Sequence, residues 1–293
     1  MDQTPRPIAA FGFVLASICS FTLMAVAGRE LAAHHDTFEI LFYRSLVGIC
    51  IVLAVGGLAG SLREVNLRHI RLHGLRNVFH FSGQSLWFFA VGAIPLGQLF
   101  ALEFTSPLWV ALAAPLVLGE AWRPTRGIAA VVGFAGILLV ARPDTIVLSP
   151  GVVAAILCAF GFAATMLMTK ILSRHESVTC IMFWLVVLQA VFGLVAAGLD
   201  GQITRPTAAS LPWLGVVGCT GLFAHWCLTN ALKRAPASVV SPMEFLRLPA
   251  MAFTGYLLYA EPLEPAVFLG GTLVLAANLL NIAAEQRRQN APT

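Results

Sequence analysis

The sequence predicts an all-α polytopic membrane protein of ten transmembrane helices, arranged as two inverted five-helix repeats at residues 8–141 and 150–284. Three observations predict this fold: the composition, the spacing of the apolar segments and an internal repeat. Of the 293 residues, 58% are hydrophobic and 11% are charged, whereas about 25% of the residues in a soluble globular protein are charged. The charged residues form short clusters between apolar runs of about 20 residues, the length that a helix needs to cross a hydrocarbon core.

Ten apolar spans follow one another along the chain, and each ends at charged residues or at Gly and Pro. We expect them at residues 8–28, 38–60, 73–94, 96–118 and 127–141 in the first half, and at residues 150–171, 178–199, 211–232, 237–259 and 266–284 in the second half. The fourth and ninth spans contain the internal prolines Pro107, Pro115, Pro242 and Pro249. Because proline lacks a backbone donor, we expect these two helices to be kinked and to move.

The second half of the chain repeats the first. The stretch that begins at Pro95 aligns without a gap with the stretch that begins at Pro236, and six positions in it are identical. We call the difference between the residue numbers of these two prolines the repeat offset. Two of the identical residues, Glu103 and Glu244, fall inside spans. A unit of five spans leaves its second copy inverted, which is the arrangement of many secondary transporters. Channels are also built by inverted duplication, so a channel or facilitator is the alternative.

The basic residues predict the orientation in the membrane. Thirteen of the 18, Arg76 among them, fall on one side, three fall on the other, and Arg44 and Arg247 fall inside spans. Because cytoplasmic loops retain Lys and Arg, we expect both termini in the cytoplasm and the protein in the plasma membrane, which is the inner membrane in a bacterium. The first span also has features of a signal peptide, but its removal would destroy the repeat, so we expect it to be retained.

Four charged residues lie within the predicted spans: Arg44, Glu103, Glu244 and Arg247. A charge at membrane depth is unfavourable by about 2.5 kcal/mol or more, which makes each one a candidate functional residue. We expect Arg44 to pair with Glu103 and Glu244 to pair with Arg247, three residues further along one helix. These four residues have two possible interpretations. They are either substrate ligands or proton-coupling groups, or they form ion pairs that hold the helices together. Two acids against two bases predict no preference for the charge of a substrate.

The third span carries a polar and aromatic stripe. His80, Gln84 and Trp87 are spaced i, i+4 and i+7, so they share one face of a helix. This stripe is a candidate cavity lining, in which Trp87 would stack on a flat substrate or face a cation. The alternatives are an interhelical hydrogen bond for His80 and packing or lipid contact for Trp87.

Longer motifs resemble a known family. The segment LGEAWRPTRGIAAVVGFAGILLVARP (118–143), its weaker partner LYAEPLEPAVFLGGTLVLAANLLN (258–281) and FYRSLVG (42–48) resemble the drug/metabolite transporter superfamily with paired EamA domains. The second copy departs from the pattern, because Ala260 stands where the first copy has Gly119. The resemblance implies a ten-helix inverted-repeat fold whose first, third, fourth, sixth, eighth and ninth helices surround a central substrate cavity. Residues 71–98 are similar to members that carry amino acids, amines, S-adenosylmethionine or riboflavin.

These observations favour a secondary active transporter that moves a small organic metabolite by alternating access. A membrane-embedded enzyme is the remote alternative, because the sequence has neither a paired-aspartate motif nor a GxSxG nucleophile. It also lacks the GxxxxGK[ST] signature of direct ATP use. The expected partners are the substrate, the lipid bilayer and a coupling ion such as the proton. Asn278 and Asn281 are candidates for bridging helices or the subunits of a homodimer.

No cofactor, metal or nucleic acid is expected. The six cysteines form no CxxC pair and stand at no spacing from histidine that suits zinc. The net charge of +4 is spread over many short loops, so it indicates membrane topology rather than a nucleic-acid surface.

Overall fold

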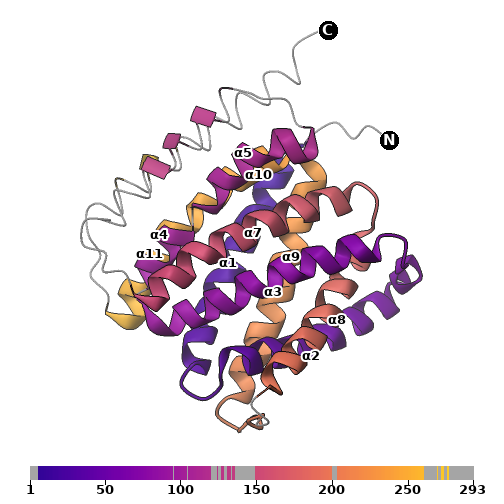
Figure 1. Cartoon of the computed structure of the whole chain (residues 1–293), viewed down its shortest axis with the longest axis vertical. Coiled ribbons are helices and arrows are strands. Elements are labelled where there is room, and N and C mark those ends of the chain that lie inside the picture. The colour runs from indigo at the N-terminus through magenta and orange to yellow at the C-terminus, as the bar shows by residue number, and fades with distance from the viewer. Residues whose placement is uncertain are drawn as a thin grey trace.

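The computed structural model describes residues 6–94, 96–103, 105–119, 149–199 and 203–260, with scattered positions in 124–135 and 269–276. Within these residues the chain is helical, and the helices pack side by side in one bundle (Figure 1). The fold class is therefore the predicted all-α class. The expected spans at 127–141 and 266–284 lie largely outside the described residues, and so do Asn278 and Asn281.

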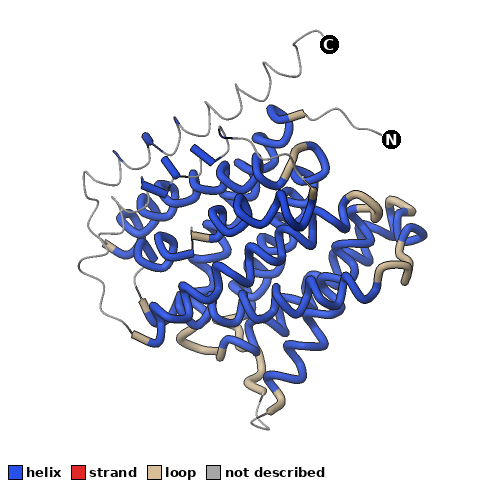
Figure 2. The backbone as a smooth tube through the Cα atoms, turned by 45° about the horizontal axis from the view of Figure 1, so that its top comes forward, coloured by secondary structure: helices blue, strands red, loops and turns tan. Residues whose placement is uncertain are grey.

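Six long helices correspond to predicted spans. They are α1 (Pro7–Leu31), α2 (Thr37–Leu58), α3 (Ile70–Ala93), α7 (Pro150–Ser173), α8 (Val178–Ala197) and α9 (Leu211–Arg234). Among the described residues, all of these except α3 are apolar enough over their length to cross a bilayer. Their connecting loops lie toward the ends of the helices (Figure 2).

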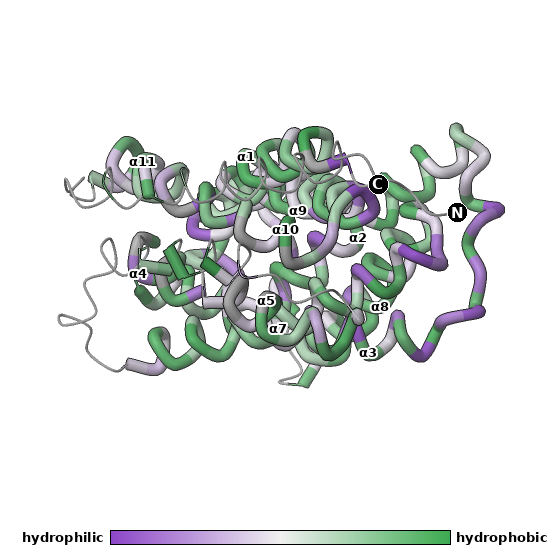
Figure 3. The backbone as a smooth tube through the Cα atoms, turned by 90° about the horizontal axis from the view of Figure 1, so that it is seen from above, coloured by the Kyte–Doolittle hydropathy of each residue, from purple (hydrophilic) through white to green (hydrophobic). Residues whose placement is uncertain are grey.

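Hydrophobic residues run along most of the helices, as the hydropathy colours of the backbone in Figure 3 show, and many large apolar side chains are exposed. Leu116 is 88% exposed and Leu199 is 81% exposed. Large apolar groups in such positions would be unfavourable in water, and they suit contact with lipid. The lengths of the apolar helices and the exposed apolar residues thus both identify the chain as an integral membrane protein.

The fourth and ninth spans are each divided, which corrects the expectation of continuous helices at 96–118 and 237–259. The fourth consists of α4 (Leu96–Glu103) and α5 (Ser106–Leu118), and the ninth consists of α10 (Ala237–Met243), the 3-10 turn η3 (Glu244–Leu246) and α11 (Arg247–Tyr259). Proline stands in the first turn of both second parts, where its missing N–H needs no helical partner. The prolines therefore set the breaks, as the sequence indicated, whereas Pro115 lies inside α5 without ending it.

The helices of the two halves recur at the repeat offset. The first residues of α8, α9, α10 and α11 follow those of α2, α3, α4 and α5, respectively, by the same separation as Pro236 follows Pro95. The helix ends agree in detail, because Gly119 after α5 and Ala260 after α11 are both left-handed, with φ of 64° and 52°. The halves interleave rather than sit apart, since α1 packs on α9, α2 on α8 and α3 on α7.

The crossing of α3 with α7 depends on two glycines. A Cβ atom on Gly161 of α7 would lie 2.9 Å from the Gly83 Cα atom of α3 and 3.0 Å from the Phe79 carbonyl oxygen. Small residues at such crossings let helix backbones approach closely in membranes. This contact brings the polar face of α3 against the second half of the chain.

Candidate functional site

A cavity of about 60 Å³ lies between the two halves, and its walls come from α1, α3, α4, α5, α7, α9, η3 and α11. These elements are the six spans that the family resemblance implies as cavity walls. The polar lining residues are Arg76, His80, Gln84, Glu103, Ser106, Thr165, Thr169, His225, Thr229, Glu244 and Arg247. A space of this size holds a few water molecules at about 10–15 Å³ each. An organic solute therefore requires the helices around it to separate.

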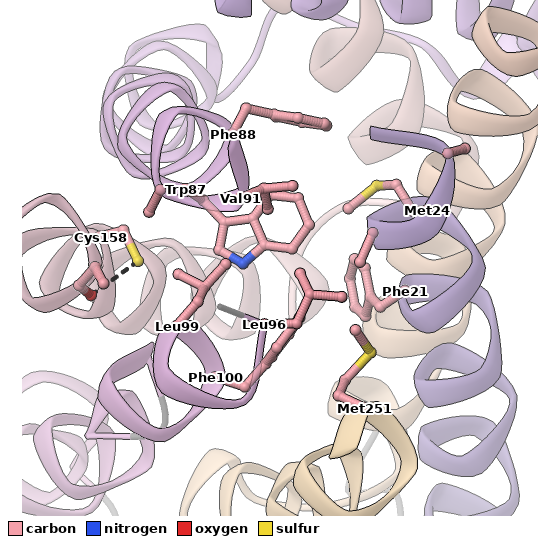
Figure 4. Packing of buried hydrophobic residues seen from close by; sticks show 14 of the residues in the cluster. Phe21, Met24, Trp87, Phe88, Val91, Leu96, Leu99, Phe100, Cys158 and Met251 are labelled. Atoms are coloured by element: carbon pink, nitrogen blue, oxygen red, sulfur yellow. Dashed lines mark hydrogen bonds between the residues drawn. The ribbon is translucent and has the colours of Figure 1, made fainter. Parts of the chain in front are cut away.

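An ion pair in the cavity joins the two halves. Arg247 Nη2 lies 2.6 Å from Glu103 Oε1, and Trp87 Nε1 donates to Glu103 Oε2 at 2.7 Å. Both carboxylate oxygens of Glu103 are thus engaged, and all three residues are buried. The Arg247 guanidinium also lies 4.8 Å from the centre of the Phe21 ring. Figure 4 shows the Trp87 indole among apolar side chains of α1 and α4, Phe100 and Phe21 among them.

This pairing corrects both predicted ion pairs. Glu103 binds Arg247 rather than Arg44, because the breaks in the two divided spans bring the end of α4 beside the start of α11. Glu244 stands in the 3-10 turn η3 instead of an α-helix. Residues three apart still share a face in such a turn, but the Arg247 guanidinium binds Glu103 across the cavity. Glu244 Oε1 has no hydrogen-bond partner among the described residues.

Arg44 lies outside this cavity, against a separate small pocket formed with Ser45, Gln189 and Gly218. Arg44 is 7% exposed, and its Nη1 atom finds no hydrogen-bond partner within the residues that the structure describes. Gly221 leaves the room that it occupies, since a Cβ atom there would come within 2.8 Å of Arg44 Nη2. Of the seven residues predicted for the site, Arg44 is the one that does not line the cavity.

Several buried polar atoms face the cavity without using their hydrogen-bonding capacity. Both ring nitrogens of His80, Nε2 of His225 and Oε1 of Gln84 lack a hydrogen-bond partner within the described part of the chain. The two imidazole rings meet edge to face with their centres 4.6 Å apart. Buried polar groups in proteins are normally paired, so this cluster is suited to bind a ligand that carries several donors and acceptors.

Equivalent positions of the two repeats build the cavity. Each of four positions on the first half faces the cavity together with the residue one repeat offset later; the pairs are Gln84 with His225, Trp87 with Leu228, Glu103 with Glu244 and Ser106 with Arg247. The site therefore lies at the interface of the two repeats and takes equivalent residues from each. The two halves contribute different chemistry to it, because only the glutamates are identical.

Arg76 is a cavity residue that sequence reasoning misplaced among the basic residues outside the membrane. It is 1% exposed, and its Nε donates to Thr169 Oγ1 at 3.2 Å. The signal was present, because Arg76 precedes His80 by one helical turn and extends the same stripe. Arg76 is a third buried arginine beside Arg44 and Arg247. It takes the place in the cavity lining that was predicted for Arg44, so the lining still holds two acids and two arginines.

Comparisons with known proteins agree with this fold. Residues 8–142 and 149–283 each match the EamA-like transporter family. A riboflavin transporter of Rhizobium johnstonii is 32% identical over 236 residues, which cover 80% of this chain and 76% of that protein. An S-adenosylmethionine uptake transporter of Rickettsia felis is 24% identical over 286 residues, which cover 98% of this chain and 96% of that protein.

One solved crystal structure shares the fold, with a TM-score of 0.79 at 16% sequence identity, over 95% of this chain and 98% of that chain. The family and the named relatives are transporters, so the alternative of a membrane-embedded enzyme falls away. With both halves of the chain matched, the predicted resemblance is confirmed: this protein belongs to the EamA-like transporter family.

Proposed function

We propose that the protein is a secondary active transporter whose central cavity binds a small organic metabolite and opens alternately to the two sides of the plasma membrane. The observation that carries this proposal is the lining of one cavity by equivalent positions of both halves. In inverted-repeat transporters the binding site lies at the repeat interface, and the repeats exchange conformations around it. The repeats would be residues 8–141 and 150–284, with both termini in the cytoplasm.

We infer a substrate with a planar heterocycle and several hydrogen-bonding groups, of the kind represented by riboflavin and S-adenosylmethionine. The unpartnered atoms of His80, Gln84 and His225 supply donors and acceptors at one wall. Trp87 and Phe162 supply aromatic surface beside them. The relatives that carry these two metabolites match most of the chain, and this supports the same class here.

The expected role of Glu244 differs between the two metabolites. Its Oε1 atom is buried and has no hydrogen-bond partner among the described residues, whereas both oxygens of Glu103 are engaged. A cationic substrate such as S-adenosylmethionine would place its charge beside Glu244. A neutral flavin would leave this carboxyl available to carry a coupling proton.

The test is saturable binding and uptake by the full chain. Purified protein is screened for thermal stabilisation by riboflavin, S-adenosylmethionine, amino acids and polyamines, and uptake of the stabilising compound is measured in proteoliposomes. Gln84→Ala and His225→Ala should abolish the shift. Ser85→Ala is the matched control on α3, because its hydroxyl bonds only the Phe81 carbonyl, and it should retain the shift.

Two results would contradict the proposal. Uptake that rises linearly without saturation indicates a channel. A shift that survives in both Gln84→Ala and His225→Ala places the substrate outside this cavity. Glu244→Gln then distinguishes the substrate, since it should weaken S-adenosylmethionine binding and leave riboflavin binding in place.

A further inference from the structure

Two polar clusters close opposite ends of the bundle, and they occupy equivalent positions of the repeats. At one end His35 Nε2 lies 3.0 Å from Ser210 Oγ. At the other end Glu176 Oε1 lies 2.6 Å from His69 Nδ1. Because Glu176 follows His35 by the repeat offset and Ser210 follows His69 by the same offset, the two contacts are copies of one interaction. Both join the first half of the chain to the second.

The cluster around Glu176 contains groups that this shared interaction does not need. His73 of α3 and Cys180 of α8 lie beside it, and both are 0% exposed. Their equivalents at the opposite end are Leu214 and Glu39. That end thus keeps its contact without a second imidazole and without a thiol.

One of the two ring nitrogens of His73 is unused. Its Nδ1 atom is buried without a hydrogen-bond partner in the part of the chain that the structure describes, and its Nε2 atom faces the Cys180 sulfur at 3.9 Å. One ligand atom from each of His73, Glu176 and Cys180 lies within 4.8 Å of the others. On a tetrahedral zinc ion with bonds of about 2.0–2.3 Å, ligand atoms stand about 3.5 Å apart. The three groups therefore reach that geometry by small side-chain movements.

We propose that His73, Glu176 and Cys180 form a binding site for a borderline-soft divalent metal ion such as Zn²⁺. Imidazole, thiolate and carboxylate are the ligands that zinc takes in proteins. On binding, the Cys180 thiol loses its proton to solvent and the thiolate becomes the ligand. Three protein ligands leave the fourth position to water. No sequence motif indicates this site, because His73 lies in the other half of the chain from Glu176 and Cys180.

The neighbours of Glu176 fit the surroundings of a metal ligand. Asn66 Nδ2 donates to Glu176 Oε2 at 2.8 Å, and His69 holds Oε1. Outer groups of this kind orient ligating carboxylates, and their loss weakens metal affinity by about 10–100-fold. The His69 side chain is 31% exposed, which opens a route for the ion from the surface. A bound ion would tie α3 to α8, and so one half of the chain to the other.

The test uses Co²⁺ as a spectroscopic probe on the full chain in detergent, purified without a polyhistidine tag. The expected result is one Co²⁺ per chain with a thiolate-to-cobalt charge-transfer band, and displacement of that band by Zn²⁺. Cys180→Ser should abolish the band. Cys158→Ser is the matched control, because Cys158 is equally buried but bonds the Ala155 carbonyl in α7, and it should keep the band.

Two further variants keep the proposal testable if Cys180→Ser does not give a monodisperse protein. His73→Gln should weaken Co²⁺ binding by more than about tenfold, and His69→Ala should weaken it by about 10–100-fold while the band remains. Absence of the band in the wild type overturns the proposal. So does a band that persists in Cys180→Ser, or wild-type affinity in His73→Gln.

Discussion

Neutralising Glu103 should destabilise the protein far more than neutralising Glu244, which stands at the equivalent position of the second repeat. Glu103→Gln keeps the shape of the side chain but leaves the Arg247 guanidinium without this carboxylate at 2.6 Å. Removing one partner of a buried ion pair destabilises proteins by about 3–5 kcal/mol. Glu244→Gln is the matched change at the equivalent position. Because Glu244 Oε1 has no hydrogen-bond partner to lose among the described residues, we expect a loss below about 1 kcal/mol.

The assay is reversible unfolding in mixed micelles with increasing SDS, followed by far-UV circular dichroism. Tryptophan fluorescence is unsuitable, because Trp87 bonds directly to Glu103. The double variant Glu103→Gln/Arg247→Met should recover at least half of the lost stability, since it removes the uncompensated charge. Equal losses in Glu103→Gln and Glu244→Gln would refute the reasoning. The reasoning would also be refuted if the double variant lost as much stability as Glu103→Gln and Arg247→Met lose in sum.

Three smaller predictions use the same unfolding assay. Gly161→Ala should lose about 1–3 kcal/mol of stability, because its new methyl group meets the Gly83 backbone. Gly12→Ala is the control, since a methyl group there has open space and should cost no stability. Equal losses in the two variants would contradict the packing argument. Ala260→Gly should gain about 1 kcal/mol by relieving a φ of 52° in the left-handed region, and an unchanged midpoint would count against this strain. Asp36→Ala should lose about 0.5–2 kcal/mol, because the Asp36 carboxylate caps α2 in a capping box; retention of full stability would show the cap to be dispensable.

The sequence was sufficient for the six long helices and for the repeat, although it did not predict that the fourth and ninth spans are divided. Apolar length located the six long helices within a few residues, since the bilayer demands about 20 apolar residues for a span and leaves little choice of boundary. The repeat offset, read from the alignment at Pro95 and Pro236, returns in the structure at helices far outside that alignment. The stripe of His80, Gln84 and Trp87 was also readable, because a helical face depends only on local spacing.

Contacts between distant segments were not readable in this way. The pairing of Glu103 with Arg247 depends on how the two broken spans meet, and spacing along the chain carries no information about that. Arg76 was misplaced for a different reason, because a rule that counts charges assigns an arginine near a helix end to the loop. Its contact with Thr169 of α7 shows instead a buried residue at the interface of the halves.

The two halves share a framework but not a set of charges, and this difference bears on how the cavity works. Arg247 stands at the register of Ser106, so the contact that ties Glu103 to the opposite half has no equivalent ion pair at Glu244 among the described residues. If both glutamates were paired alike, the two inverted conformations would be held by similar contacts. With an ion pair at Glu103 and no hydrogen bond at Glu244 Oε1 among the described residues, the conformation seen here is held at one side of the site. Binding at Glu244 is then the interaction best placed to offset that bias.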